Sequence, residues 1–198
     1  LSLFCYLRFD RTGRKIFCVL SVTLFILAML SKGSVVGLPV VILLCVWWLK
    51  GTISKRDIIR SIPFFAVSAV MSVVEIWFQY NCAIGEDVVR SDSFFSRLAG
   101  AGWAVWFYLY KAVLPINLTF IYPRWNIDPA NPVSYVPGLL LIVLLSLAWR
   151  YRRNWGRPVF FALSFYVVML LPVLGFFNIY FMRYSFVADH YQYVSIIS

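Results

Sequence analysis

The sequence predicts an all-α protein, a polytopic bundle of transmembrane helices with about five complete spans and one interfacial or re-entrant helix. Of its 198 residues, 62% are hydrophobic and 13% are charged, and a soluble domain of this length could not bury that much apolar surface. Short basic clusters separate the apolar runs. The net charge of +10 is therefore distributed as the positive-inside rule predicts for inner loops, and we expect no nucleic-acid partner.

The longest apolar run, residues 16–49, contains a single charged residue, Lys32. One continuous helix over this run would be about 50 Å long, against a hydrocarbon core of about 30 Å. The glycines and the proline of LSKGSVVGLP, around Lys32, predict a break. We therefore expect two helices, about 16–30 and 35–49, that form a hairpin. This hairpin places its two flanking basic clusters on the inner membrane face and Lys32 on the outer face. The clusters are Arg8, Arg11, Arg14 and Lys15 before it, and Lys50, Lys55, Arg56 and Arg60 after it.

A third span is expected at about 62–80, with Pro63 in its first turn, where proline is tolerated. A mixed external connection, residues 81–135, follows it. Within this connection, 98–114 is apolar enough to span the membrane, but a span there would deliver the arginines at 150–157 to the outer face. The segment is also dense in Trp, Tyr and Phe beside a lysine, which is typical of the membrane interface. We therefore interpret it as an interfacial or re-entrant helix, with a true span as the alternative.

Two further spans, about 136–149 and 158–177, are expected to form a second hairpin with an arginine-rich inner connection. Residues 178–190 would then be external, and another span would begin at about Tyr191. The chain opens and stops inside apolar stretches. We therefore interpret residues 1–198 as a single transmembrane domain that is a fragment of a larger protein.

Basic and aromatic side chains gather on the outer face in this topology. Lys32 and Arg183 are candidates to bind a lipid phosphate, because cations neutralise phosphate and a guanidinium can bind it bidentately. Glu75, inside the third span, is a further candidate, because an ionisable group within a membrane is functional by default. Candidates for contact with a donor or acceptor substrate are Tyr122, Arg124, Trp125, Tyr184, Asp189 and His190. No metal-ligand spacing is present, and we expect no metal site.

Several of these residues also have a plainer structural interpretation. Lys32 can extend to the interface from the end of a span without binding anything. Arg124 can pack as a cation over Trp125. Asp189 and His190 together suggest acid–base chemistry, but a lone histidine is more often structural.

The sequence resembles one family over nearly its whole length. LAMLSKGSVVGLPVVILL, residues 27–44, resembles the helix break of the polytopic GT-C glycosyltransferases, the superfamily of protein O-mannosyltransferases and lipid A aminoarabinose transferases. Arg183-Tyr184 resembles the external Arg-Tyr element of these enzymes. WFYLYKAVLPINLTFIYPRWNID and VADHYQY are more closely similar to bacterial membrane proteins related to the TMTC O-mannosyltransferases, which are often followed by tetratricopeptide repeats.

This resemblance implies an enzyme that transfers a sugar from a polyprenyl-phosphate donor to an acceptor protein hydroxyl or glycan. It implies the bacterial inner membrane, with the active site facing the periplasm, and no cofactor beyond the lipid-linked donor. The catalytic acidic residue of the family lies in a first external loop that this chain does not contain. The catalytic base is therefore unassigned, and Asp189 is not given that role. The alternatives are an O-antigen ligase or polymerase-like enzyme, and a transporter or flippase of an anionic lipid.

Overall fold

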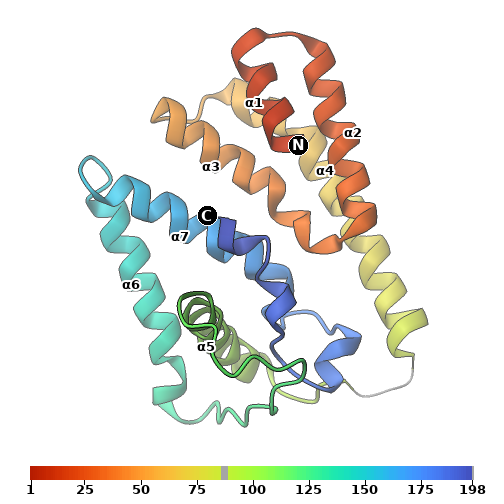
Figure 1. Cartoon of the computed structure of the whole chain (residues 1–198), viewed down its shortest axis with the longest axis vertical. Coiled ribbons are helices and arrows are strands. Elements are labelled where there is room, and N and C mark those ends of the chain that lie inside the picture. The colour runs from red at the N-terminus through yellow and green to blue at the C-terminus, as the bar shows by residue number, and fades with distance from the viewer. Residues whose placement is uncertain (86–88, 198) are drawn as a thin grey trace. The chain divides into compact units, whose positions relative to one another are not determined.

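The computed structural model describes residues 1–85 and 89–197, and these residues form helices, turns and loops without a strand. The predicted all-α class is confirmed (Figure 1). The chain divides into two compact units, Leu1–Glu75 and Ile76–Ser198, and each is described by itself. The predicted external connection 81–135 includes residues 86–88, which lie outside the described residues.

Within the described residues, four helical segments are long and apolar enough to cross a membrane. They are Gly33–Lys50, Lys55–Ile84, Pro132–Arg150 and Gly156–Val173. A fifth apolar helix, Lys15–Ser31, is shorter. By the length and composition of its helices the chain is an integral membrane protein, and its five apolar helices fall where the five predicted spans were expected.

The first unit contains α1 (Ser2–Thr12), α2 (Lys15–Ser31), α3 (Leu38–Lys50) and most of α4 (Lys55–Phe78). α1 packs against α2 and α3. The aromatic ring of Tyr6 on α1 meets that of Phe64 on α4 edge-on, with centroids 5.5 Å apart. The core of this unit consists of Tyr6, Phe9, Phe25, Met29, Ile42, Val46 and Phe64.

The helix break predicted around Lys32 is present. Lys32 has an extended backbone at the end of α2, and a short 3-10 helix, η1 (Gly33–Gly37), leads into α3. Pro39 lies in the first turn of α3, where its missing N–H leaves no helical hydrogen bond unmade. Ser68 on α4 donates a hydrogen bond to the Val36 carbonyl (3.1 Å), which fixes η1 against α4.

Ion pairs join α1 to the end of α3 and to the first turns of α4. Lys50, at the end of α3, lies 2.8 Å from Asp10 and 2.9 Å from Asp57. Arg60 also reaches Asp10, at 3.2 Å. The basic clusters before α2 and after α3 therefore meet at one end of the unit. This is the arrangement that the hairpin interpretation requires.

The prediction that Pro63 lies in the first turn of its helix is wrong. α4 begins at Lys55, so that Pro63 is inside it. The start is set by a capping box, in which the Asp57 N–H donates to the Ser54 hydroxyl (3.3 Å) and the Ser54 N–H donates to the Asp57 carboxylate (2.9 Å). After Phe78 the helix widens into a π-helical turn, η2 (Gln79–Ile84).

The second unit is built on the antiparallel pair α6 (Val136–Arg150) and α7 (Gly156–Leu170), joined by a short turn. This α6–α7 hairpin carries its arginines at the turn, and a 3-10 helix, η3 (Pro132–Tyr135), precedes α6. α7 and the 3-10 turn that follows it, η4 (Leu171–Val173), end before the predicted boundary at residue 177. The chain leaves the helical path there because Gly175 has a φ of 92°, in the left-handed region.

α5 (Phe94–Val113) crosses the α6–α7 hairpin at its open end. Figure 1 shows α5 almost end-on while α6 runs lengthwise. The two helices touch where a Cβ on Gly102 would lie only 2.8 Å from the Gly138 nitrogen. The Trp106 indole donates to the Pro137 carbonyl (2.9 Å), and the Tyr166 hydroxyl donates to the Val105 carbonyl (2.9 Å). α5 is not among the four candidate spans, and this crossing favours the interfacial interpretation.

The prediction of a new span at about Tyr191 is not met in the described residues. Short 3-10 turns occupy this part of the chain instead: η5 (Tyr180–Arg183), η6 (Asp189–Tyr191) and η7 (Ser195–Ile197). η7 packs against α7, so the end of the described chain lies on the α6–α7 hairpin.

Candidate functional site

The strongest candidate site lies where two loop segments, 114–131 and 178–192, fold over α5. A hydrogen bond joins the two segments, a second lies within segment 178–192, and a third fixes that segment to α5. The Tyr122 N–H donates to the Ser185 hydroxyl (3.2 Å), which donates in turn to the Val187 carbonyl (2.6 Å). The Ala188 N–H donates to the hydroxyl of Tyr108 on α5 (3.1 Å). These contacts place residues from distant parts of the sequence at the open end of the hairpin.

Tyr122 and Asp189, both predicted site residues, are brought into direct contact. The Tyr122 hydroxyl donates a hydrogen bond shared by the two Asp189 carboxylate oxygens, at 2.9 and 3.0 Å. The same hydroxyl accepts from the Thr119 N–H (3.3 Å). The Tyr122 side chain is buried, and its ring packs edge-on against Phe107, with centroids 4.9 Å apart. The phenol thus holds the carboxylate in one orientation, and the carboxylate is half-buried.

Lys111 is a site residue that the sequence interpretation used only as a marker of the interface. Its side chain is 7% exposed, and its ammonium donates to the carbonyls of Ile116 (2.7 Å) and Asn117 (3.2 Å). It also lies 5.3 Å from the ring centroid of Tyr122. Asn117 has a φ of 50°, which turns the chain back over the ammonium. A buried cation is therefore satisfied by carbonyls and an aromatic face.

His190 lies among aromatic rings. Its ring centroid is 4.5 Å from Tyr191, 5.7 Å from Phe181 and 6.4 Å from Phe120, the last in a stacked arrangement. This environment favours the structural interpretation of the histidine over an acid–base role.

Arg124 and Trp125 have different aromatic partners from the one expected. The Arg124 guanidinium lies 4.8 Å from the ring centroid of Phe186, and it donates to the Val89 carbonyl (3.3 Å). Trp125 instead packs edge-on against Phe107, at 5.5 Å. The expected packing of Arg124 on Trp125 is thus replaced by packing on Phe186.

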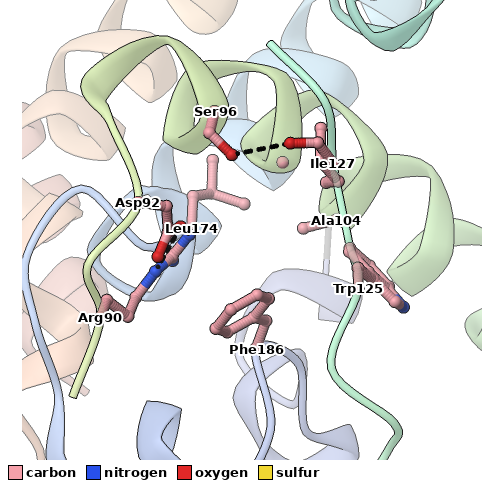
Figure 2. Close-up of a pocket in the computed structure, with 9 residues that line it drawn as sticks. Arg90, Asp92, Ser96, Ala104, Trp125, Ile127, Leu174 and Phe186 are labelled. Carbon is pink, nitrogen blue, oxygen red and sulfur yellow. Dashed lines mark hydrogen bonds and ion pairs between the residues drawn. The ribbon is translucent and has the colours of Figure 1, made fainter.

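A second arginine shares the Phe186 ring. Arg90 lies 4.2 Å from its centroid and forms an ion pair with Asp92 (Figure 2). The space that these residues enclose with Trp125 is about 20 Å³, room for one water molecule. Burial acts to raise the pKa of the Asp92 carboxyl, but the hydrogen bonds and charge of Arg90 outweigh it and leave that pKa below its ordinary value. This cluster is closed and structural.

The two predicted phosphate ligands belong to different units. Arg183 is the exposed last residue of η5, and the hydroxyl of its neighbour Tyr184 lies 3.4 Å from that of Tyr180. Lys32 is exposed at the break between α2 and α3. Each therefore presents a cation beside a turn of its own unit.

Glu75 lies directly against the helix break. A Cβ placed on Gly33 would overlap the Glu75 carboxylate. Only glycine therefore fits beside Lys32 while the carboxylate holds this position. The break in the first unit thus contains a carboxylate as well as a lysine.

In the parts of the chain that the structure describes, no group of three or more His, Cys, Asp or Glu side chains could hold a metal. No family model, curated protein or solved structure matches the chain. The class that the fold and the site define is an all-helical integral membrane protein with a polar and aromatic cluster at the open end of its α6–α7 hairpin.

Proposed function

We propose that this chain is part of an integral-membrane glycosyltransferase of the GT-C type. It moves a sugar from a polyprenyl-phosphate donor to an acceptor, a protein hydroxyl, on the periplasmic face of a bacterial inner membrane. The observation that carries the proposal is the hydrogen-bonded pair of Tyr122 and Asp189 at the open end of the α6–α7 hairpin, opposite its arginine-rich turn. The positive-inside rule assigns that open end to the outer face.

An interfacial position for α5, which we infer from its aromatic composition and its crossing of the α6–α7 hairpin, supports this assignment. A lipid-linked substrate keeps its tail in the bilayer while its phosphate and sugar lie at the headgroup level, so its enzyme needs polar groups at that depth. α5 supplies a buried lysine there, and the loops over it supply an aspartate and several aromatic rings. Tyr122, Arg124, Trp125, Tyr184, Asp189 and His190 remain the candidates for contact with donor or acceptor.

Lys32 and Arg183 are separate candidates, one in each unit, to bind the lipid phosphate. In the transfer step the acceptor hydroxyl attacks the anomeric carbon, the bond from that carbon to the phosphate oxygen breaks, and the lipid phosphate leaves. Preorganised cations stabilise the charge that develops on such a leaving group. The proton of the acceptor hydroxyl goes to a base that we do not assign to any residue of this chain.

The test is transfer of a radiolabelled sugar from a polyprenyl-phosphate donor by the full-length protein that contains this chain, reconstituted in lipid vesicles. We expect K32A and R183A each to lower the transfer rate on the order of 100-fold. The matched controls K55A and R152A remove a basic residue from the inner clusters and should leave the rate unchanged. Absence of transfer, or equal rates in all four variants, rules the proposal out.

Two alternatives give different products in the same vesicles. A ligase or polymerase-like enzyme would add the label to a lipid-linked glycan instead of a protein. A flippase would move the intact labelled lipid between leaflets without releasing sugar. The carboxylate of Glu75 beside the helix break is the observation that favours a transporter, because transporters place ionisable groups within their spans.

A further inference from the structure

An open groove lies beside loop segment 114–131, which carries Tyr122 and Trp125. It encloses about 330 Å³ between α5, the loop around residues 125–127 and η3. This volume is at the lower end of the range of small-molecule sites, roughly 300–1,000 Å³. Trp103 of α5 and Trp125 of the loop are its two aromatic walls. The groove is thus large enough for a ligand, unlike the closed space beside Arg90.

All the side chains that line this groove are uncharged. An anionic group would find no cation there, so the groove does not suit the phosphate of a lipid. Its polar groups are two carboxamides, Asn126 and Asn131, and the Ser134 hydroxyl. An acyl tail would leave these groups without hydrogen bonds and is therefore also disfavoured. The lining favours a neutral ligand that has hydroxyl groups and an apolar face.

The polar groups of the groove are held in fixed positions. The Asn131 side-chain oxygen accepts a hydrogen bond from the Val133 N–H (3.0 Å), which leaves its NH₂ group to donate. The Ser134 hydroxyl donates to the Asp128 carbonyl (2.8 Å), which leaves its oxygen to accept. A donor and an acceptor are therefore preorganised on one side of the groove.

The two tryptophans that line the groove differ in how much the surrounding residues bury them. Trp125 is half-buried and packs on Phe107, and the loop that carries it is fixed where Ser96 of α5 donates to the Ile127 carbonyl (3.1 Å). Trp103 is 44% exposed on α5. Trp106, nearby on α5, uses its indole N–H on the α6 backbone. Trp103 is instead placed where a ligand can cover its face.

We propose that this groove binds a neutral sugar ring. Trp103 and Trp125 contact its apolar C–H face, and Asn126, Asn131 and Ser134 bond its hydroxyl groups. The sugar has two possible sources, the head of the lipid-linked donor and a glycan on the acceptor. That choice rests on the proposed glycosyltransferase function, whereas binding of the ring does not.

The test is equilibrium binding to the protein in lipid nanodiscs, followed by tryptophan fluorescence without any lipid-linked donor. The probes are methyl glucoside, methyl mannoside, N-acetylglucosamine and maltohexaose, with glucose 6-phosphate as the charged comparison. We expect saturable binding of at least one neutral sugar and weaker binding of the phosphorylated one. W103A and N126A should each weaken it about tenfold. W155A, which removes an exposed tryptophan from the α6–α7 turn, should leave it unchanged.

N126A changes an exposed side chain and keeps the test valid if W103A misfolds. Absence of binding by every neutral sugar, or equal affinity in N126A and W155A, overturns the proposal. Addition of the polyprenyl-phosphate sugar then separates the two sources: competition indicates the donor's sugar, and simultaneous binding indicates the acceptor glycan. Transfer without sugar binding in the groove contradicts this inference alone, and binding without transfer contradicts the proposed function alone.

Discussion

The Tyr122 hydroxyl and the Asp189 carboxylate, 67 positions apart in sequence, are joined by a hydrogen bond shared between both carboxylate oxygens, at 2.9 and 3.0 Å. This contact links the two loop segments that fold over α5. Because the phenol also accepts from the Thr119 N–H, it fixes the backbone of its own loop segment as well as the carboxylate of the other. The following predictions test this link and the contacts around it.

Tyr122→Phe should loosen the second loop segment. The variant removes a hydrogen bond to a charged group, a loss of about 1.5–3 kcal/mol of stability, while the ring packing on Phe107 remains. We expect a lower melting temperature and faster amide hydrogen exchange in residues 185–192. Tyr193→Phe, at an exposed tyrosine, is the matched control. Unchanged exchange in Y122F would show that the bond does not hold the segment.

Lys111→Met should release the turn at Asn117. Methionine keeps the apolar part of the side chain but cannot donate to the Ile116 and Asn117 carbonyls, so we expect a stability loss of about 2 kcal/mol. Limited proteolysis should cut residues 114–122 faster in this variant. Lys55→Met, at an exposed lysine, should have no such effect. Equal cleavage in the two variants would contradict the role given to Lys111.

Gly33→Ala should destabilise the helix break, because the added methyl group overlaps the Glu75 carboxylate. The carboxylate is the far end of an exposed side chain that can move aside, so we expect a loss of about 1 kcal/mol or less. In the double variant G33A/E75A the clash is absent, so the effects of the two changes should not add. Gly138→Ala, where a Cβ would have open space, is the control. Simple additivity in thermal unfolding would show that Gly33 and Glu75 do not meet.

The protein should lose stability in acid as the Asp92 carboxylate becomes protonated. Its pKa is lowered from the ordinary 3.8 in the folded protein, so the folded state binds its proton less readily than the unfolded state does. The resulting stability is complete above pH 3.8 and is lost as the pH falls through the lower, folded value. Melting curves between pH 2.5 and about 6 should show a smaller acid loss in D92N than in D128N, a control at an exposed aspartate. Equal acid losses would contradict the assignment.

Membrane topology can be tested with single cysteines in a background without the native Cys5, Cys18, Cys45 and Cys82. We expect K55C and R152C to be labelled by an impermeant reagent from the inner side, and R124C from the outer side. Labelling of positions 124 and 152 from the same side would require α5 to span the membrane and would overturn its interfacial assignment.

Hydropathy and charge pattern were sufficient to predict the hairpins. The break at Lys32 could be predicted because a helix rises about 1.5 Å per residue. A 34-residue apolar run is therefore too long to cross a hydrocarbon layer of about 30 Å once as a single helix. The end of α7 was placed too late because the apolar stretch continues past it, whereas the α-helix ends at Leu170, tightens into η4 and leaves the helical path at Gly175. The start of α4 had a sequence signal, the Ser54–Asp57 capping box, which the apolar pattern concealed.

By itself the sequence determined the helical class, the order of the apolar helices and the break at Lys32, since each depends on local composition relative to a membrane. Tertiary structure alone decided that Tyr122 meets Asp189, that Arg124 lies over Phe186, that Lys111 is buried under a turn, and that Trp103 and Trp125 face one groove. Those contacts join residues far apart in the chain or depend on the direction of individual side chains. No periodicity encodes them, because they arise only when the loops pack over α5.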